Sequence, residues 1–355
     1  MKTFISFLIV MLCLHQNAES QGCVAIRSMG GYCTAPHADS SKWQVSINNR
    51  YFKSFRHFIG TVEQKKRQTL CNELINHQFT SDINITHKLN ARWSYMIDLP
   101  IEANSRSSLY EHNNIGRFTT HSFGLGDMRV ALYSWLKNPE KMPKFNVQLG
   151  LGIKFATGNY NVQDYFHLTD STTRLGPVDQ SIQLGDGGTG LTFELNTFYN
   201  LSERINFYGN FYYLSNPQEQ NGVSTTRGGV ASASTIANGS NVMSVPDQFM
   251  FRAGINYLAH KFTFSAGIRE ECLPPKDLIG GSGGFRRPAY IISAEPGVTY
   301  SIGKVNIYAY VPVALVRNRT QSVPDQISTK LTGKYTQGDA AFADYAVNIG
   351  ISCRF

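Results

Sequence analysis

The sequence has few charged residues and no long hydrophobic segment apart from one at its start. Asp, Glu, Lys and Arg make up 16% of the 355 residues, which is less than a soluble exported enzyme normally carries. Hydrophobic residues make up 42%, and the one long apolar run, residues 4–14, is too short to span a membrane as a helix. The composition therefore excludes a helical membrane protein and disfavours a soluble enzyme.

The apolar run at the start has the features of a targeting segment. It follows Lys2 and is followed by Ala18-Glu19-Ser20, a small-x-small cleavage pattern before Gln21. We therefore expect residues 1–20 to be a secretory signal peptide that is cleaved on export, and they are left out of the fold.

Cysteine is sparse, and no Cys-x-x-Cys or Cys/His spacing suggests a metal site. Cys23 and Cys33 bracket a Gly-rich stretch and are expected to form a disulfide in an oxidising compartment. Cys71 and Cys272 could pair across two loops or stay free, and Cys353 is expected to be a lone thiol. Neither a metal nor a cofactor is expected.

What the sequence does contain is apolar alternation at period two. From Leu191 to Tyr199 and again from Ile205 to Tyr213, alternate positions are largely apolar, and a short polar link, residues 200–204, separates the two runs. This period indicates extended strands, because successive side chains leave opposite faces of the pleat. The two runs predict an antiparallel hairpin whose arms are about ten residues long, enough for a tilted strand to cross a bilayer.

The same unit recurs along the chain, giving about twelve strands. Short links fall near residues 90, 140, 202, 260 and 302, and long ones span residues 58–77, 104–120, 157–188, 215–247, 271–288 and 317–338. We therefore predict an all-β, antiparallel, up-and-down transmembrane barrel over residues 43–355, with short periplasmic turns and long extracellular loops. Its polar parity should face the lumen and its apolar parity should face lipid. Residues 21–42 could plug that lumen, tied by Cys23–Cys33, or hang in the periplasm.

The end of the chain carries an independent signal. Apolar side chains occupy every second position from Tyr345 to Phe355. This resembles the C-terminal pattern by which bacterial outer-membrane proteins engage the barrel-assembly machinery, although an ordinary terminal strand could also end at Phe. The expected location is the Gram-negative outer membrane.

Charged residues on the lumen parity are candidates for selectivity. They could form a ladder that selects solutes, or pair with one another as a structural network, and pairing is the favoured interpretation, with some groups lining a narrow path. The candidates are Arg92, Asp98, Glu102, Arg129, Lys154, Glu194, Arg252, Arg269 and Glu295.

A second candidate site lies in loop 271–288, where Phe285, Arg286 and Arg287 adjoin. These residues could hold an anionic or aromatic ligand at the channel mouth, or bind lipid phosphate.

Two patterns point to other chemistry, but their context is unfavourable. Gly185-x-Gly187-x-x-Gly190 matches a dinucleotide fingerprint, yet a strand rather than a helix should follow it, so the glycines are expected to shape a loop that enters the barrel. His121-Ser122 lacks an identifiable third member of a catalytic triad. We therefore predict neither catalytic residues nor nucleic-acid binding.

Three glycine-containing strings suggest a family. Residues 124–127 read Gly-Leu-Gly-Asp, residues 150–158 end in Ala-Thr-Gly, and residues 184–190 read Leu-Gly-Asp-Gly-Gly-Thr-Gly. Their order, within roughly residues 120–260, resembles the outer-membrane transporters of the MetA-pathway phenol-degradation family, relatives of FadL-type channels. The resemblance implies passive uptake of small hydrophobic or aromatic solutes. The alternatives are a barrel that anchors or partners a surface or secretion assembly and, third, a barrel hydrolase.

Overall fold

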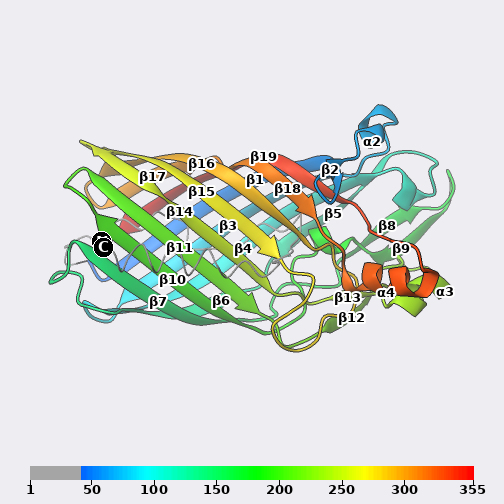
Figure 1. Cartoon of the computed structure of the whole chain (residues 1–355), viewed down its shortest axis with the longest axis horizontal. Helices are drawn as coiled ribbons and strands as arrows, with labels where there is room; N and C mark the ends of the chain where they lie inside the picture. The colour runs from blue at the N-terminus through cyan, green and yellow to red at the C-terminus, as the bar shows by residue number, and fades with distance from the viewer. Residues whose placement is uncertain (1–40) are drawn as a thin grey trace.

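The computed structural model describes residues 41–355, and it shows a closed antiparallel barrel (Figure 1). Two of its wall strands are each split into halves, β5 with β6 and β17 with β18, so the wall has twelve strands, as predicted. The wall consists of β1 (Trp43–Ile59), β3 (Ile75–Lys88), β4 (Trp93–Ser108), β5 (Phe118–Leu125), β6 (Arg129–Trp135), β7 (Phe145–Lys154), β10 (Gly190–Asn200), β11 (Ile205–Ser215), β14 (Gln248–Ala259), β15 (Phe262–Leu273), β16 (Ala289–Ile302), β17 (Val305–Tyr310), β18 (Val313–Arg319) and β19 (Ala340–Arg354). The signal peptide, segment 21–40 and the Cys23–Cys33 disulfide lie outside the described residues.

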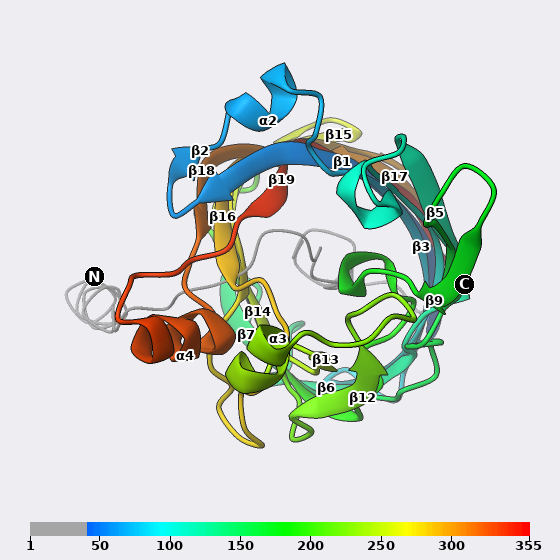
Figure 2. The same cartoon turned by 90° about the vertical axis from the view of Figure 1, so that its right-hand side faces the viewer.

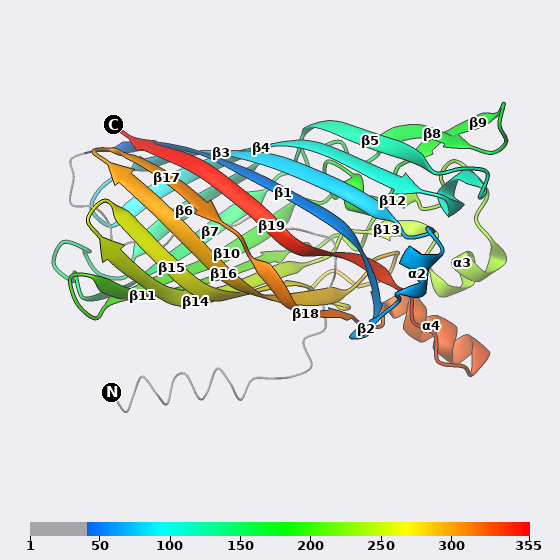
Figure 3. The same cartoon turned by 90° about the horizontal axis from the view of Figure 1, so that it is seen from above.

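The barrel closes where its last strand meets its first. β19 runs antiparallel to β1, with Val45 opposite Cys353, and Trp43 and Phe355 exchange backbone hydrogen bonds of 3.0 and 2.9 Å (Figure 3). Closure pairs the backbone groups that an open edge would expose to lipid. Near Phe52–Arg56 the register with β19 shifts, which marks a bulge in the wall.

The two ends of the barrel differ, as the connection lengths predicted. Tight turns and the C-terminus lie at one end, and the short extra elements lie at the other (Figure 1). These extra elements are β2 (Val62–Glu63), α2 (Lys66–Thr69), η1 (Tyr110–His112), β8 (Gln163–His167), β9 (Thr173–Pro177), η2 (Gln180–Ile182), β12 (Gln220–Ser224), α3 (Ala233–Asn238), β13 (Val242–Ser244) and α4 (Val323–Thr332). We call this end the loop end and the opposite end the turn end. Over residues 41–355, no helix is long and apolar enough to cross a membrane.

Side-chain polarity is inverted relative to a soluble protein. In β10, Leu191 and Phe193 are exposed on the outer face, whereas the intervening Thr192 and Glu194 are 2% and 3% exposed. In β7, Leu151 is 66% exposed. Water cannot be the solvent for an outer face of this kind, so the apolar parity faces lipid and the polar parity fills the lumen.

The strands extend further toward the loop end than the alternation predicted. Residues 104–120 were expected to be loop, but β4 continues to Ser108, and β5 begins at Phe118. In this part of the wall Arg106 and Ser108 are buried, while the opposite face carries Ser105 and Ser107. This end of the strand lies beyond the part of the wall that meets lipid, and both of its faces are polar. The hydrophobic alternation therefore ends before the strand does.

One break in the wall positions the functional site. Leu125 of β5 lies opposite Ile101 of β4, but Arg129 of β6 lies opposite Asp98, so the broken strand carries one extra residue. The break is therefore a bulge, and it places Asp127 inside the barrel, where its side chain is buried.

The lipid-facing assignment predicts the effect of a charge on the outer face. Leu151→Arg should destabilise the folded barrel by about 2–4 kcal/mol if the position lies near the bilayer midplane. The measurement is urea unfolding in lipid vesicles. The same substitution at exposed Leu331 in α4, beyond the wall strands, is the matched control and should be nearly neutral. Equal losses at both positions would contradict the assignment.

Candidate functional site

Residues 178–188, which we call the lumen segment, leave the loop end and pack inside the barrel. Val178 and Ile182 are fully buried, although they belong to a connection rather than to the wall. The wall holds the segment by its backbone: Gln78 Nε2 donates to Ser181 O at 2.5 Å, and Ser122 Oγ donates to Ile182 O. Seen along the barrel from the loop end, β12, β13 and α3 lie over one side of the opening (Figure 2). The prediction of a loop entering the barrel is confirmed, and the strand β10 follows it at Gly190.

Asp127 joins the three glycine-containing strings of the sequence. Its carboxylate accepts from Gly158 N at 2.9 Å and from Asp186 N at 3.2 Å, and it lies 3.4 Å from Lys154 Nζ. A Cβ added at Gly185 would lie 2.5 Å from Asp127 Oδ1, so this position requires glycine for close approach. The strings therefore build one junction between the wall and the lumen segment.

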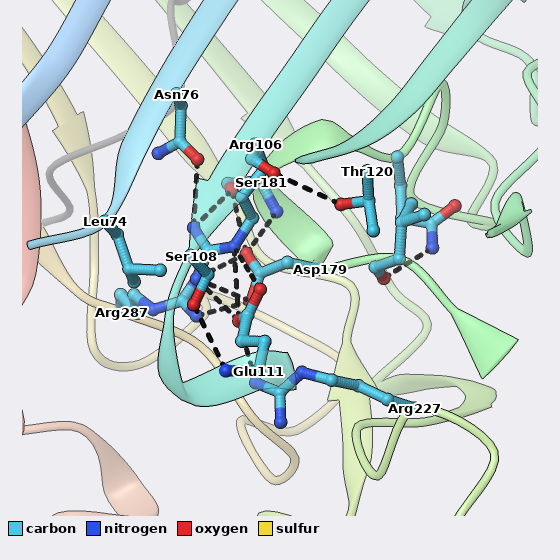
Figure 4. Close-up of polar contacts among 12 residues, drawn as sticks. Leu74, Asn76, Arg106, Ser108, Glu111, Thr120, Asp179, Ser181, Arg227 and Arg287 are labelled. Atoms are coloured by element: carbon cyan, nitrogen blue, oxygen red, sulfur yellow. Dashed lines mark hydrogen bonds and ion pairs between the residues drawn. The ribbon is translucent and has the colours of Figure 1, made fainter. Parts of the chain in front are cut away.

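A cluster of five charged residues, which we call the Asp179 clamp, fastens the other end of the lumen segment (Figure 4). Arg287 donates to both carboxylate oxygens of Asp179 at 2.9 and 2.6 Å, and Arg106 Nη2 lies 3.4 Å from the same carboxylate. Glu111 in turn accepts from Arg106 at 3.0 Å and from Arg227 at 2.8 Å. Bidentate arginine–carboxylate pairs are the stronger kind of ion pair, so the clamp holds the segment in a defined place.

The charges of the clamp determine how it titrates. Burial by itself raises the pKa of Asp179, but Arg106 and Arg287 outweigh it and hold that pKa well below its ordinary range. Burial likewise opposes ionisation of Glu111, and Arg106 and Arg227 nevertheless lower its pKa. A carboxylate with a lowered pKa stabilises the folded arrangement at pH values above its unfolded pKa, and this stabilisation is lost as the pH falls through the lower, folded value.

The sign of these shifts predicts an acid-sensitive lumen. Ion conductance should stay nearly constant from about pH 8 down to about pH 4, because the lowered pKa values keep the clamp carboxylates ionised through their ordinary titration range, and it should rise only at lower pH. Planar-bilayer recordings across this range provide the measurement. A rise between pH 7 and pH 6 instead would point to histidine and not to the clamp.

Of the loop-mouth candidates, Arg286 is buried and Phe285 and Arg287 are half-buried, and both arginines are engaged by carboxylates of the chain itself. Arg286 and Asp277 form a two-point pair at 2.6 Å, and both side chains are 0% exposed. Arg287 belongs to the Asp179 clamp and stacks over Phe285 at 4.7 Å. Arg286 is therefore withdrawn from solvent and lipid, whereas Arg287 also lines the cavity described below, and a ligand role for it stays a prediction.

Arg92 is the one lumen candidate that the structure places elsewhere. It lies exposed in the turn before β4 and donates to Trp135 O at 2.9 Å and Leu136 O at 3.1 Å. Arg92 was assigned to the lumen by counting alternate residues along the strand. The count continued into the turn, where side chains no longer alternate between the two faces. The remaining candidates, Asp98, Glu102, Arg129, Lys154, Glu194, Arg252, Arg269 and Glu295, are all buried on the lumen side of the wall.

Most of the lumen charges form two networks. In one, Arg129 of β6 pairs with Glu194 of β10, which also accepts from Tyr133 Oη at 2.9 Å. In the other, Glu295 accepts from Arg252 at 2.5 Å and from Arg269 at 3.2 Å.

The second network also crosses the lumen. Glu271 of β15 accepts from Arg269 at 2.8 Å and from Arg50 of β1 at 2.7 Å, although β1 and β15 are not neighbours in the wall. The placement fits the favoured interpretation of a paired network in a narrow lumen, whereas any role of these charges in selectivity remains a proposal.

A cavity of about 150 Å³ remains between the wall and the lumen segment. Charges of both signs line it, including Arg129, Lys154, Asp98, Glu102 and Asp127. Its apolar lining consists of Leu184, Tyr212, Leu214, Met243, Pro246 and Leu273.

Other chemistry finds little support in the described part of the chain. His121 is exposed on β5, while the adjacent Ser122 faces the lumen and donates to a backbone carbonyl, so the two do not act as a base and a nucleophile. Cys71 is an exposed free thiol, so of the two alternatives for Cys71 and Cys272 the disulfide is not formed. Cys353 is a free thiol, as expected. Residues 41–355 contain no group of three His, Cys, Asp or Glu side chains placed to hold a metal ion.

Comparison with known proteins supports the fold. Neither a protein-family model nor a curated protein sequence matches this chain. Among solved structures, an outer-membrane channel from Pseudomonas putida F1 matches at a TM-score of 0.58 and 9% identity, covering 93% of this chain and 100% of the other. This likeness concerns the fold, a closed antiparallel barrel of the outer-membrane type.

Two further similar structures are more distant. A mutant of the TodX monoaromatic hydrocarbon channel matches at a TM-score of 0.42 with 9% identity, covering 95% of this chain and 99% of the other. The translocator domain of the autotransporter NalP from Neisseria meningitidis matches at 0.44 with 12% identity, covering 90% of each. These likenesses are too remote to bear on function.

Sequence reasoning missed several residues of the site. Asp179 and Asp186 lie in a connection without periodicity, and Arg106 and Glu111 lie in a stretch expected to be loop. Asp127 and Asp186 did have a signal, since each lies in one of the glycine-containing strings.

Proposed function

We propose that this protein is an outer-membrane channel for the passive uptake of small solutes, narrowed by its own lumen segment. The observation that carries the proposal is the lumen segment itself, a connection that turns into a closed barrel and is held there by the Asp127 junction and the Asp179 clamp. A polar lumen surrounded by an apolar outer face is the architecture that lets polar groups meet a solute within lipid.

The lining of the cavity supports a class of solute. Its volume of about 150 Å³ suits one small molecule at a time, since a cavity of similar size can hold a benzene ring. Leu184, Tyr212 and Leu214 supply apolar surface there. Together with the resemblance of the glycine-containing strings to transporters of the MetA-pathway phenol-degradation family, this lining favours small solutes with an apolar or aromatic part.

The surroundings of the barrel follow from the same proposal. The apolar outer face would contact outer-membrane lipid, and the terminal strand ending in Phe355 would be recognised by the barrel-assembly machinery during insertion. Depleting that machinery in cells should leave the unfolded chain in the periplasm.

The experiment is transport by the purified full chain in proteoliposomes. Osmotic swelling with a panel of small solutes should exceed that of protein-free vesicles, and planar bilayers should show discrete conductance steps. Absence of flux for every solute, in wild type and in a variant with a weakened clamp, would overturn the channel proposal. The alternative of a barrel that partners a surface or secretion assembly would then remain.

A further inference from the structure

Positive charge is concentrated at the turn end of the barrel. The turns between the wall strands, residues 89–92, 136–144, 201–204, 260–261 and 303–304, together with Lys42 in front of β1, contain eight cationic side chains and two acidic ones, Glu140 and Glu203. The cations are Lys42, Arg92, Lys137, Lys141, Lys144, Arg204, Lys261 and Lys304, and all of them are exposed. This end therefore carries six of the eight net positive charges of the sequence.

Six of these cations form a ring, which we call the turn-end ring. Every wall strand that runs from the turn end toward the loop end begins directly after a Lys or Arg. The ring consists of Lys42 before β1, Arg92 before β4, Lys144 before β7, Arg204 before β11, Lys261 before β15 and Lys304 before β17. The backbone carbonyl of each accepts a hydrogen bond from the neighbouring strand, as Lys42 O does from Lys88 N at 2.7 Å. Because ascending and descending strands alternate around the wall, the cations recur at every second strand around the whole barrel.

Lipid-facing aromatic side chains lie directly beside the turn-end ring. Four of the six strands begin with an aromatic residue that is between 39% and 44% exposed, namely Trp43, Trp93, Phe145 and Phe262. Lys144 Nζ lies 5.9 Å from the centre of the Tyr199 ring, and Tyr199 lies opposite Phe145 on the outer face. Aromatic belts mark the level of the lipid headgroups, and Lys or Arg side chains beside them extend into the headgroup layer. The ring therefore lies at the height of lipid phosphates.

The distribution of the cations favours lipid over other anionic partners. A partner protein would contact one side of the barrel, whereas the ring surrounds it. An anionic solute would be met by side chains that point into the lumen, but Lys144 lies over an outer-face aromatic ring, and Arg92 donates to the carbonyls of Trp135 and Leu136 at the rim. Within residues 41–355, none of the six ring cations forms an ion pair with a carboxylate, so their charge is available to phosphate.

We propose that the turn-end ring binds acidic phospholipids through their phosphate groups, in the leaflet that this end of the barrel faces. Each ring cation would meet the phosphate of an adjacent lipid, and the aromatic side chain beside it would pack against the glycerol and the upper acyl chain. A zwitterionic lipid carries its own cation, which repels the ring, whereas an acidic lipid leaves the charge of its phosphate uncompensated. A Lys or Arg near an anionic surface favours it by about fivefold, an effect that salt screens.

The tryptophans of the chain provide the measurement. All three lie at the turn end, where Trp43 begins β1, Trp93 begins β4 and Trp135 ends β6. Trp43 and Trp93 are exposed on the lipid face, whereas Trp135 packs against buried Phe198 and contributes a constant background. The full chain is placed in phosphatidylcholine vesicles that contain either brominated phosphatidylglycerol or brominated phosphatidylcholine, and fluorescence quenching gives the relative affinity of the two lipids for the turn end. Phosphatidylglycerol should be preferred about fivefold at low salt and by less than about twofold in roughly 0.5 M salt.

Two fourfold variants separate the ring from net charge. In the turn-end variant, Lys42, Lys144, Lys261 and Lys304 are each replaced by Gln, and the preference should fall to less than about twofold. In the loop-end variant, the exposed residues Lys66, Lys276, Lys330 and Lys334 are each replaced by Gln, which changes the net charge equally and should leave the preference as in the wild type. Heat-modifiability in gels checks that each variant forms a barrel.

The outcomes test this proposal apart from the channel function. Equal quenching by the two lipids in the wild type at low salt overturns it, and so does a preference that persists in a folded turn-end variant. A preference lost equally in the loop-end variant assigns the effect to net charge and overturns the role of the ring. If the turn-end variant alters only the flux of anionic solutes, the cations serve the solute path instead. Because quenching requires no transport, a barrel without flux for any solute still gives the lipid result.

Discussion

Asp179→Ala should open the channel. Asp179 is the only carboxylate of the clamp that lies on the lumen segment, and it holds the segment to Arg287 and Arg106. Removing one partner of a buried ion pair typically costs about 3–5 kcal/mol, and about 3 kcal/mol corresponds to a shift of roughly a hundredfold in an equilibrium. We therefore expect the population with a displaced lumen segment, and with it the mean conductance in planar bilayers, to rise strongly.

The control for this prediction is Asp170→Ala. Asp170 is exposed between β8 and β9, in the same long connection as Asp179 but outside the lumen. Its loss removes the same charge without touching the clamp, so the conductance should match that of the wild type. If Asp179→Ala leaves conductance unchanged in a barrel that still folds, the lumen segment does not restrict the path.

Glu295→Gln should strongly destabilise the barrel. Glu295 is 1% exposed and accepts from Arg252 at 2.5 Å and from Arg269 at 3.2 Å, and Arg269 also reaches Glu271. The amide preserves the shape of the side chain but leaves two buried guanidinium groups with one negative charge fewer. A loss of about 3–5 kcal/mol in the free energy of unfolding is expected. Urea unfolding in lipid vesicles, followed by tryptophan fluorescence, measures it.

The comparison for Glu295 is Glu203→Gln in the exposed turn between β10 and β11. This change removes the same charge from a solvated position and should shift stability by less than about 0.5 kcal/mol. A similarly small effect of Glu295→Gln would mean that water screens the lumen arginines and that the network does little to hold the wall.

The wall strands were predictable wherever one face meets lipid. Residues 145–154 alternate strictly between Phe, Val, Leu or Ile and polar or small side chains, and they form β7 with its apolar side chains outward. Residues 104–108 form strand just as well, but they lie beyond the lipid zone with polar side chains on both faces. Apolar and polar residues alternate only where the two faces of a strand meet different environments, here lipid and the lumen. Where both faces are polar, the alternation is absent and the strand cannot be recognised from the sequence.

The candidate site was predictable only in part. Arg129 and Glu194 were identified as lumen residues because each lies on the polar parity of its own strand. Their pairing was not visible, because β6 and β10 are separated by β7 in the wall and the two side chains meet across it inside the barrel. The alternation shows on which face of the sheet a side chain lies. Which other side chain it pairs with depends on the tilt of the strands and on the width of the closed barrel.

The sequence by itself determined the barrel: its strand number, its inside-out polarity and the end at which the long connections lie. Each of these follows from local alternation and spacing, which need no contact between distant residues. Only the tertiary structure decided that residues 178–188 turn inward, that Asp179 meets Arg106 and Arg287, and that a small cavity remains between the wall and this segment. These features depend on side chains that are far apart in the chain and come together only when the wall closes, so local periodicity carries no trace of them.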